Sequence, residues 1–276
     1  MLSLLFRWHP GVEITFLSVG QGDGILVQEG NFTMLVDGGS SSNNALSSQT
    51  LLPFIKCQGI QKLNLVLITH WDADHYNGIM ELLESEEGKQ VRVGKILLPD
   101  TGGELHNEGY EKIMEVARGR NIPIRYLKTG DLISSETIKL TVLNPNQGYV
   151  SDNINDYSIV TRLEYGAFSC LLTGDVTGEA EEMLADKVSD VMVLKVAHHG
   201  SNYSTPVEFL NSACPKYAVI SVGKKNRYGH PGEELLERLE ASGARIYRTD
   251  QAGAVMVWTD GEKMTLKTFL QPEADK

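Results

Sequence analysis

The amino-acid sequence predicts an α+β fold: a single-domain, four-layer αββα sandwich in which two sheets pack together and helices cover their outer faces. Two observations lead to this prediction. Apolar strand-like runs alternate with helical segments in both halves of the chain, and neighbouring strands are often joined by tight glycine-containing turns. Because such hairpins are frequent, the sandwich fits better than a doubly wound parallel sheet.

In the first half, an alternating run at 12–19 precedes the glycine-rich turn "GQGDG", and the runs at 24–30 and 32–39 pair as a hairpin. Later segments alternate between the two periodicities. Helices are expected at 49–59, 76–87 and 107–122, and strands at 63–70, 93–99, 124–131 and 138–145.

In the second half, the runs at 156–166 and 168–175 form a predicted hairpin. A second predicted hairpin, at 245–253 and 254–261, closes the domain. Between them, helices are expected at 178–186, 206–215 and 233–243, and strands at 191–201 and 217–223.

The predicted domain comprises residues 12–270, between two short terminal segments. The segment 1–11, "MLSLLFRWHPG", is too short to span a bilayer and lacks the cleavage pattern of a secretory signal. It is interpreted as a first strand, a linker or the stub of a preceding membrane helix. Residues 271–276 are interpreted as a frayed tail.

Composition is ordinary for a globular protein. Of 276 residues, 41% are hydrophobic and 22% are charged, so the chain can build a core without disulfides or other staples. The three cysteines, Cys57, Cys170 and Cys214, form no recognisable framework. Cys170 lies in the apolar run "FSCLLTG" and is expected to be buried as a small hydrophobe.

The chain is acidic. It has 25 Lys and Arg against 36 Asp and Glu, a formal charge of −11. This argues against a broad basic surface for nucleic acid. A polyanionic substrate is still compatible, because two divalent metals would add about four positive charges at one point of a cleft.

The stretch "THWDADHYNG" carries four candidate metal ligands: His70, Asp72, Asp74 and His75. It follows a buried-strand pattern, and alternate residues of an extended segment point the same way. A turn at Asp74 then brings all four into one bowl, a set that suits zinc, manganese or iron. The alternative is a solvated turn that caps the next helix through Asp72 or Asp74.

Three further clusters stand at strand ends or loops. "LLTGD" ends in Asp175, "VAHHGS" carries His198 and His199, and "NRYGHP" carries His230. Adjacent histidines on a strand point in opposite directions, so one of the pair is expected to ligate while the other meets substrate or orients the ligands. His9 and His106 are not expected to take part.

These motifs resemble those of the metallo-β-lactamase superfamily, whose metal motif HxHxDH is matched by "HWDADH" with Asp72 replacing the middle histidine. "LVDGG" resembles the superfamily's first motif, so the resemblance implies that Asp37 supports the metal loop without ligating. "LLTGD" matches the motif whose aspartate, here Asp175, bridges two metals.

A narrower resemblance is to the C-terminal domain of the ComEC/Rec2 family of polytopic DNA-import proteins. It rests on "VGQGD", "THWDADHYNG", "LKVAHHGSNYSTP" and "RYGHP", and runs from about Val12 to Trp258. The resemblance implies a domain at the extracytoplasmic face of a bacterial membrane, attached to the membrane only through a parent protein. It also implies a nuclease that acts on DNA, including single-stranded DNA.

Two departures from the superfamily bear on the metal. Asp72 replaces a neutral histidine nitrogen with an anionic oxygen, which is a harder ligand, so manganese becomes an alternative to zinc. The third-motif histidine is missing, and "NINDYS" stands in its place. One metal therefore lacks a ligand unless His198 or His199 supplies it.

The sequence thus predicts a phosphodiesterase with two divalent ions, zinc or manganese. His70, Asp72 and one histidine of the pair, His198 or His199, would hold the first ion, and Asp74, His75 and His230 the second. Asp175 would bridge the two ions. Asp74, Asp175 and His199 are the expected catalytic residues. The only basic cluster near a motif, Lys224, Lys225, Arg227 and Tyr228, is the expected substrate contact, with a solvated loop as its alternative.

Two other functions compete with this prediction. The first is a small-molecule hydrolase of the same fold, of the phosphorylcholine esterase or lactonase type, because fold does not determine substrate. The second is a non-catalytic domain that binds DNA.

Overall fold

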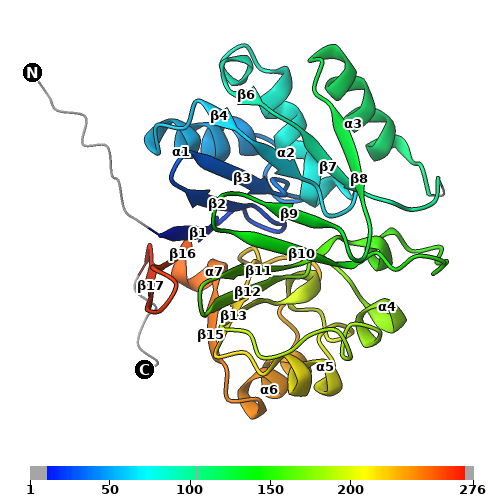
Figure 1. The fold of residues 1–276 in the computed structure, drawn as a ribbon, viewed down its shortest axis with the longest axis vertical. Coiled ribbons are helices and arrows are strands. Elements are labelled where there is room, and N and C mark those ends of the chain that lie inside the picture. Colours follow the sequence, from blue (N-terminus) through cyan, green and yellow to red (C-terminus); the bar gives the residue numbers. More distant parts are fainter. Residues whose placement is uncertain (1–10, 104, 271–276) are drawn as a thin grey trace, which may run out of the picture.

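The computed structural model describes residues 11–103 and 105–270, and it confirms the four-layer arrangement (Figure 1). The segment interpreted as a membrane-helix stub, apart from Gly11, lies outside the described residues, as do His9 and the tail at 271–276. Within the described ranges, no helix combines the length and apolar character needed to cross a membrane.

The first sheet is mixed. Strands β1, β2 and β3 form an antiparallel meander, and β5, β7 and β8 continue in parallel from β3. Among the described residues its order is β17 (Met264–Thr268), β16 (Val255–Thr259), β1 (Val12–Phe16), β2 (Ile25–Glu29), β3 (Phe32–Val36), β5 (Leu65–Leu67), β7 (Ile96–Pro99), β8 (Ile124–Leu127).

The second sheet has the same mixed character. Strands β9 to β12 are antiparallel neighbours, and β13, β14 and β15 add in parallel. Its order in the described chain is β15 (Arg245–Arg248), β14 (Tyr217–Ile220), β13 (Val193–Lys195), β12 (Phe168–Leu172), β11 (Val160–Tyr165), β10 (Lys139–Asn144), β9 (Leu132–Ser134). A separate two-stranded ladder joins β4 (Lys62–Leu63) to β6 (Arg92–Val93).

Helices cover the outer face of each sheet, as Figure 1 shows above and below the two sheets. The first layer comprises α1 (Leu52–Cys57), α2 (Ala73–Glu84) and α3 (Glu108–Gly119). The second comprises α4 (Gly178–Glu182), α5 (Val207–Ala213) and α6 (Glu233–Ala241). The short α7 (Thr249–Ala252) links β15 to β16.

Alternation along the strands separates three cores. In β3, Met34 and Val36 face the core between the sheets, whereas Leu35 faces the core beneath α2 and α3. A third core lies between the second sheet and its helices, where Leu171 of β12 packs with Phe209 of α5. Since apolar burial is worth about 25 cal/mol per Å², these three layers are the main favourable contribution to the fold.

Two expectations about the strands are wrong. Residues 245–253 and 254–261 do not form a hairpin: β15 adds in parallel to β14 in the second sheet, and β16 pairs with β1 and β17 in the first. The two sheets also do not correspond to the two sequence halves. The strand expected at 138–145, which is β10, and the neighbouring β9 belong to the second sheet. Short turns suggest hairpins, but α7 instead carries the chain from one sheet to the other.

The sandwich brings several strand ends together. β5 leads into the segment before α2, β12 leads into Asp175, and β13 leads into the turn Ala197–Gly200. β5 belongs to the first sheet and β12 and β13 to the second, and contacts of Asp175 with His75 and His199 show that the loops after these strands meet at one rim of the sandwich. The expected burial of Cys170 in β12 is confirmed, at 0% exposure.

Candidate metal centre

Asp37 holds the loop that carries the first histidines. It follows β3, is buried, and accepts hydrogen bonds from the Thr69 backbone N–H and the Thr69 hydroxyl, both at 2.8 Å. Its Oδ2 lies 2.9 Å from His75 Nδ1. A carboxylate on Nδ1 fixes the ring so that Nε2 points into the centre.

The next residues enter from the start of α2. His70 and His75 are fully buried with ring centroids 4.1 Å apart, whereas Asp72 and Asp74 are partly exposed. Asp72 occupies the N-cap position but makes no capping hydrogen bond, so the helix-cap alternative lacks its key contact. Instead, Asp72 Oδ2 lies 3.7 Å from His70 Nε2.

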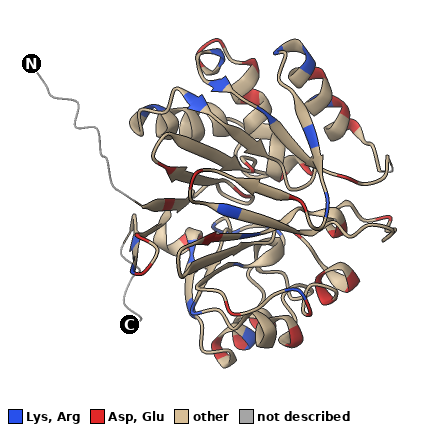
Figure 2. Ribbon diagram, in the orientation of Figure 1, with Lys and Arg blue, Asp and Glu red and all other residues tan. Residues whose placement is uncertain are grey.

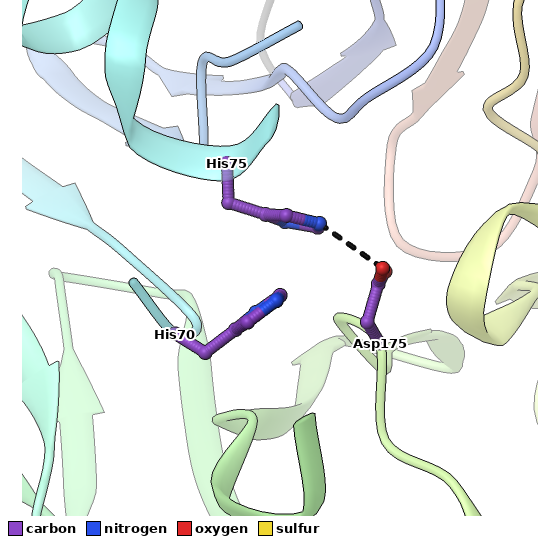
Figure 3. Close-up of side chains that lie close together, drawn as sticks. All are labelled: His70, His75 and Asp175. Atoms are coloured by element: carbon purple, nitrogen blue, oxygen red, sulfur yellow. Dashed lines mark ion pairs between the residues drawn. The ribbon is translucent and has the colours of Figure 1, made fainter. Parts of the chain in front are cut away.

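Asp175 contacts histidines that follow strands of both sheets. It follows β12, and its Oδ2 lies 3.2 Å from His75 Nε2 and 3.1 Å from His199 Nε2. Figure 3 shows His70 and His75 converging on this carboxylate. His199 Nε2 also lies 3.5 Å from Asp74 Oδ2, so one imidazole links both acidic residues.

His198 and His199 do not continue the strand, contrary to expectation. They lie in a turn after β13, with left-handed φ values of 50° and 53°. His199 is buried and its Nδ1 lies 3.0 Å from the Ser221 carbonyl, which leaves Nε2 for the centre. His198 is only partly buried, and its ring lies beside that of His230, with centroids 5.7 Å apart.

The donor atoms fit a divalent metal. The Nε2 atoms of His70, His75 and His199 are buried without a hydrogen-bond partner, although polar atoms in protein interiors are nearly always paired. Among the described residues there are four overlapping groups of possible ligands, and within each group the ligand atoms lie within 4.8 Å of one another. They are His70, His75 and Asp175; Asp74, His75 and His199; Asp23, Asp175 and His199; and Asp23, Asp37 and His75.

In the protein alone, the acidic and basic groups compensate one another. Burial opposes the charge on His199, but Asp175 and Asp74 outweigh it and raise the pKa of His199 to about 10. Likewise, burial raises the pKa of Asp74, but His199 and His75 prevail and lower it to about 2. The carboxylates stabilise the protonated form of the His199 imidazole. Metal binding to this ring must therefore displace its proton.

Two buried charged residues in this centre were missed by sequence reasoning. Asp23, from the "GQGDG" turn, lies 3.8 Å from His75 Nδ1, and Lys195 of β13 lies 2.5 Å from Asp23. The turn requires glycine, because a Cβ on Gly22 would come within 2.6 Å of the Asp74 carbonyl. A lysine inside the apolar run "VMVLKVA" was an available signal, since buried lysines need a partner.

The expected substrate residues lie on the loop before His230. Lys224, Lys225, Arg227 and Tyr228 are all exposed. The Arg227 guanidinium lies over the Tyr228 ring at 4.9 Å, and Tyr228 stacks on His230 with centroids 5.7 Å apart. His106 is outside this group and stacks on Tyr110.

A family model described as the Metallo-beta-lactamase superfamily matches residues 17–224. The chain belongs to the metallo-β-lactamase superfamily. The matched range includes Asp37, the His70–His75 loop, Asp175 and the histidine turn.

The chain also resembles competence proteins over most of its length. It is 33% identical over 261 residues to ComE operon protein 3 of Bacillus subtilis, covering 88% of this chain and 32% of that protein. It is 31% identical to competence protein ComA of Neisseria gonorrhoeae, covering 88% and 31%. For recombination protein 2 of Haemophilus influenzae the identity is 27%, covering 92% and 30%. The chain thus spans about a third of the length of these ComEC/Rec2-type relatives.

Solved structures agree on the fold. The metallo-β-lactamase fold protein YhfI from Bacillus subtilis has a TM-score of 0.63 at 12% identity and covers 90% of this chain and 100% of its own. The diiron β-hydroxylase CmlA from Streptomyces venezuelae gives 0.56 at 14%, covering 91% and 55%. Zinc-bound PqqB from Methylobacterium extorquens gives 0.53 at 10%, covering 86% and 97%.

Proposed function

We propose that this chain is a metal-dependent phosphodiesterase that hydrolyses DNA. The observation that carries the proposal is the convergence of His70, His75 and His199 on the Asp175 carboxylate, with the Nε2 atoms of all three imidazoles buried and directed to one point. Membership of the superfamily supports hydrolysis, and the resemblance to competence proteins favours DNA as the substrate.

The proposed ligands form two overlapping sets. His70, with Asp72 close to its Nε2, would hold one divalent ion, and Asp74 with His199 would hold the other. Asp175 and His75 lie between the two sets. The sequence-based hypothesis placed His198 or His199 with the first ion and His230 with the second. This assignment instead places His199 with the second ion, because His199 faces Asp74 and Asp175. The mixed nitrogen and oxygen donors suit zinc or manganese.

When bound, two such ions neutralise phosphodiester charge and lower the pKa of water towards neutrality. The chain's own residues then orient the substrate. His198 and His230 stand beside the ligand sets, and burial lowers the pKa of His230 to about 4, so its imidazole is neutral near pH 7. A neutral ring of either residue can donate an N–H hydrogen bond to a phosphate oxygen or accept a proton from water.

The loop before His230 supplies the proposed DNA contacts. Lys224, Lys225 and Arg227 provide positive charge, and Tyr228 is an exposed aromatic residue that can stack on a base if Arg227 moves off its ring. Stacking would favour single-stranded DNA. We place the domain in a longer DNA-uptake protein at the extracytoplasmic face of the membrane, consistent with relatives about three times its length.

The substrate is tested with a panel of purified reactions. Labelled single- and double-stranded DNA, a model phosphodiester, a phosphorylcholine ester and a lactone are each incubated with the chain and Mn²⁺ or Zn²⁺. We expect cleavage of DNA and of the model diester. Fast turnover of the phosphorylcholine ester or the lactone without DNA cleavage would favour the small-molecule hydrolase. DNA binding with no turnover of any substrate would favour the non-catalytic alternative.

A further inference from the structure

Lys195 is a fully buried cation beside the metal centre. Its side chain is 1% exposed, and its Nζ donates to the Gly174 carbonyl at 2.9 Å. It lies 2.5 Å from Asp23 Oδ2 and 3.7 Å from Asp175 Oδ1. Neither lysine nor aspartate stays fully buried without such partners.

Asp23 ties this cation to the glycine-rich turn. Its side chain is 0% exposed, and its backbone N–H donates to the Asp74 carbonyl at 3.1 Å. Its carboxylate also approaches the Nδ1 atoms of His75 and His199, at 3.8 and 3.9 Å. The Asp23–Lys195 pair therefore lies behind the proposed ligands, on the side away from solvent.

The two oxygens of Asp175 face different partners. Oδ2 points to His75 and His199, whereas Oδ1 is the oxygen nearest to Lys195. Gly174, whose carbonyl accepts from Lys195, directly precedes Asp175. Lys195 thus contacts both the backbone and the carboxylate of this segment, which restricts how the carboxylate can turn.

We propose that Lys195 and Asp23 form a positioning pair that directs Asp175 Oδ2 towards the metals. This inference rests on the proposed metal site, and it concerns residues that do not themselves touch substrate. The pair has no net charge, so it orients Asp175 without adding repulsion against bound cations. Groups that orient metal ligands in this way commonly change metal affinity by about 10–100-fold.

The test compares two double variants in which one pair of opposite charges is removed. Asp23→Asn/Lys195→Met removes the buried pair, and Lys56→Met/Glu87→Gln removes an exposed pair of the first helix layer. Metal-free protein is titrated with Mn²⁺ by calorimetry, and folding is followed by thermal melting. The Mn²⁺-loaded samples are examined by electron paramagnetic resonance for coupling between neighbouring ions.

We expect the buried-pair variant to lose about 10–100-fold in Mn²⁺ affinity and to show a weaker coupled signal at saturation. The exposed-pair control should match the wild type in both. Asp23→Asn alone, which keeps an acceptor for Lys195, should show a smaller loss in the same direction and serves if the double variant does not fold.

Two results separate this inference from the proposed function. Unchanged Mn²⁺ affinity and coupling in a folded buried-pair variant would overturn the positioning role while leaving the hydrolase proposal intact. Wild-type protein that binds Mn²⁺ without cleaving DNA would instead contradict the proposed function, and the loss of affinity in the variant would still support the positioning pair.

Discussion

Among single residues, Glu181 is an acid buried behind the histidine turn. It is 0% exposed and accepts a hydrogen bond from the Thr205 backbone N–H at 2.8 Å. Burial raises the pKa of Glu181 to about 8, although Thr205 and Arg238 act in the opposite direction. The carboxyl group is therefore largely protonated in the folded protein near neutral pH.

This predicts a loss of stability as pH rises. The ordinary pKa of the group is 4.5, so between pH 4.5 and about 8 the folded state binds more protons than the unfolded state. The contribution to the free energy of unfolding is complete below pH 4.5 and is lost as pH rises to about 8. Glu181→Gln keeps the acceptor for Thr205 and cannot titrate. We expect its stability to exceed that of the wild type at pH 8 by on the order of a few kcal/mol.

Urea denaturation at pH 5, 6, 7 and 8 measures this difference. Glu182→Gln is the matched control, because the neighbouring Glu182 is exposed. Parallel stability profiles for the wild type and Glu181→Gln would rule out a pKa raised by burial.

At the scale of elements, the start of α2 is held by close contact with the loop after β3. A Cβ on Gly39 would lie 2.4 Å from the His75 backbone nitrogen and 2.3 Å from the Asp74 carbonyl carbon. Both neighbours are backbone atoms, which cannot yield as a flexible side chain would. Because Gly39 has no side chain, the start of α2 can lie this close to the loop after β3.

We predict that Gly39→Ala displaces the start of α2. The displacement moves Asp74 and His75, so Mn²⁺ affinity should fall by at least about 10-fold together with stability. Gly119→Ala is the control: this residue ends α3, and a Cβ there meets nothing within 4 Å. Alanine favours helix over glycine by up to about 1 kcal/mol, so the control should be neutral or stabilising. Equal effects on metal affinity in the two variants would contradict the packing argument.

The elements also show what the sequence could predict. His70 and Asp175 were identifiable because each follows an apolar strand, and strand ends from the two sheets meet at one rim. Asp23 was missed because "GQGDG" also fits an ordinary turn. Lys195 was missed because a single lysine in an apolar run does not reveal which residue it pairs with. Their contact joins two sheets and depends on tertiary packing.

The choice between His198 and His199 shows the same limit. Sequence alternation assumed a strand, whereas left-handed φ values at both residues turn the chain and direct His199 to the centre. The β15–β16 hairpin failed because a short connection cannot reveal which sheet each strand joins. Local pattern predicts elements, but sheet membership depends on long-range pairing.

For the whole molecule, charge is distributed against tight DNA binding. The formal charge is −11, and acidic residues are frequent on α4 and α6 in the outer layer of the second sheet (Figure 2). The exposed Lys224, Lys225 and Arg227 lie on the loop that leads to His230, whose ring is beside that of His198. A polyanion is therefore attracted over a small area.

We predict weak DNA binding with a shallow salt dependence. Each neutralised phosphate contributes a slope of about −0.7 to −0.9 in log affinity against log salt, so few contacts give a small total. Lys224→Glu/Lys225→Glu should weaken binding further, whereas Lys62→Glu/Lys89→Glu, two exposed lysines of the opposite half, should change it little. Binding is measured by fluorescence anisotropy from 50 to 300 mM salt, a range of about sixfold. A slope that requires about six or more phosphate contacts would contradict a small contact area.

The most direct test of the proposal that the chain is a metal-dependent DNA hydrolase is a cleavage time course with metal-free protein, to which Mn²⁺ or Zn²⁺ is then restored. The wild type should cleave labelled DNA only after metal is added. Asp175→Asn should be folded yet lose at least about 1,000-fold in rate, on the order of 4 kcal/mol in barrier height, because its amide cannot supply the shared anionic oxygen. Cleavage in the presence of chelator, or wild-type rates in metal-loaded Asp175→Asn, would contradict the account.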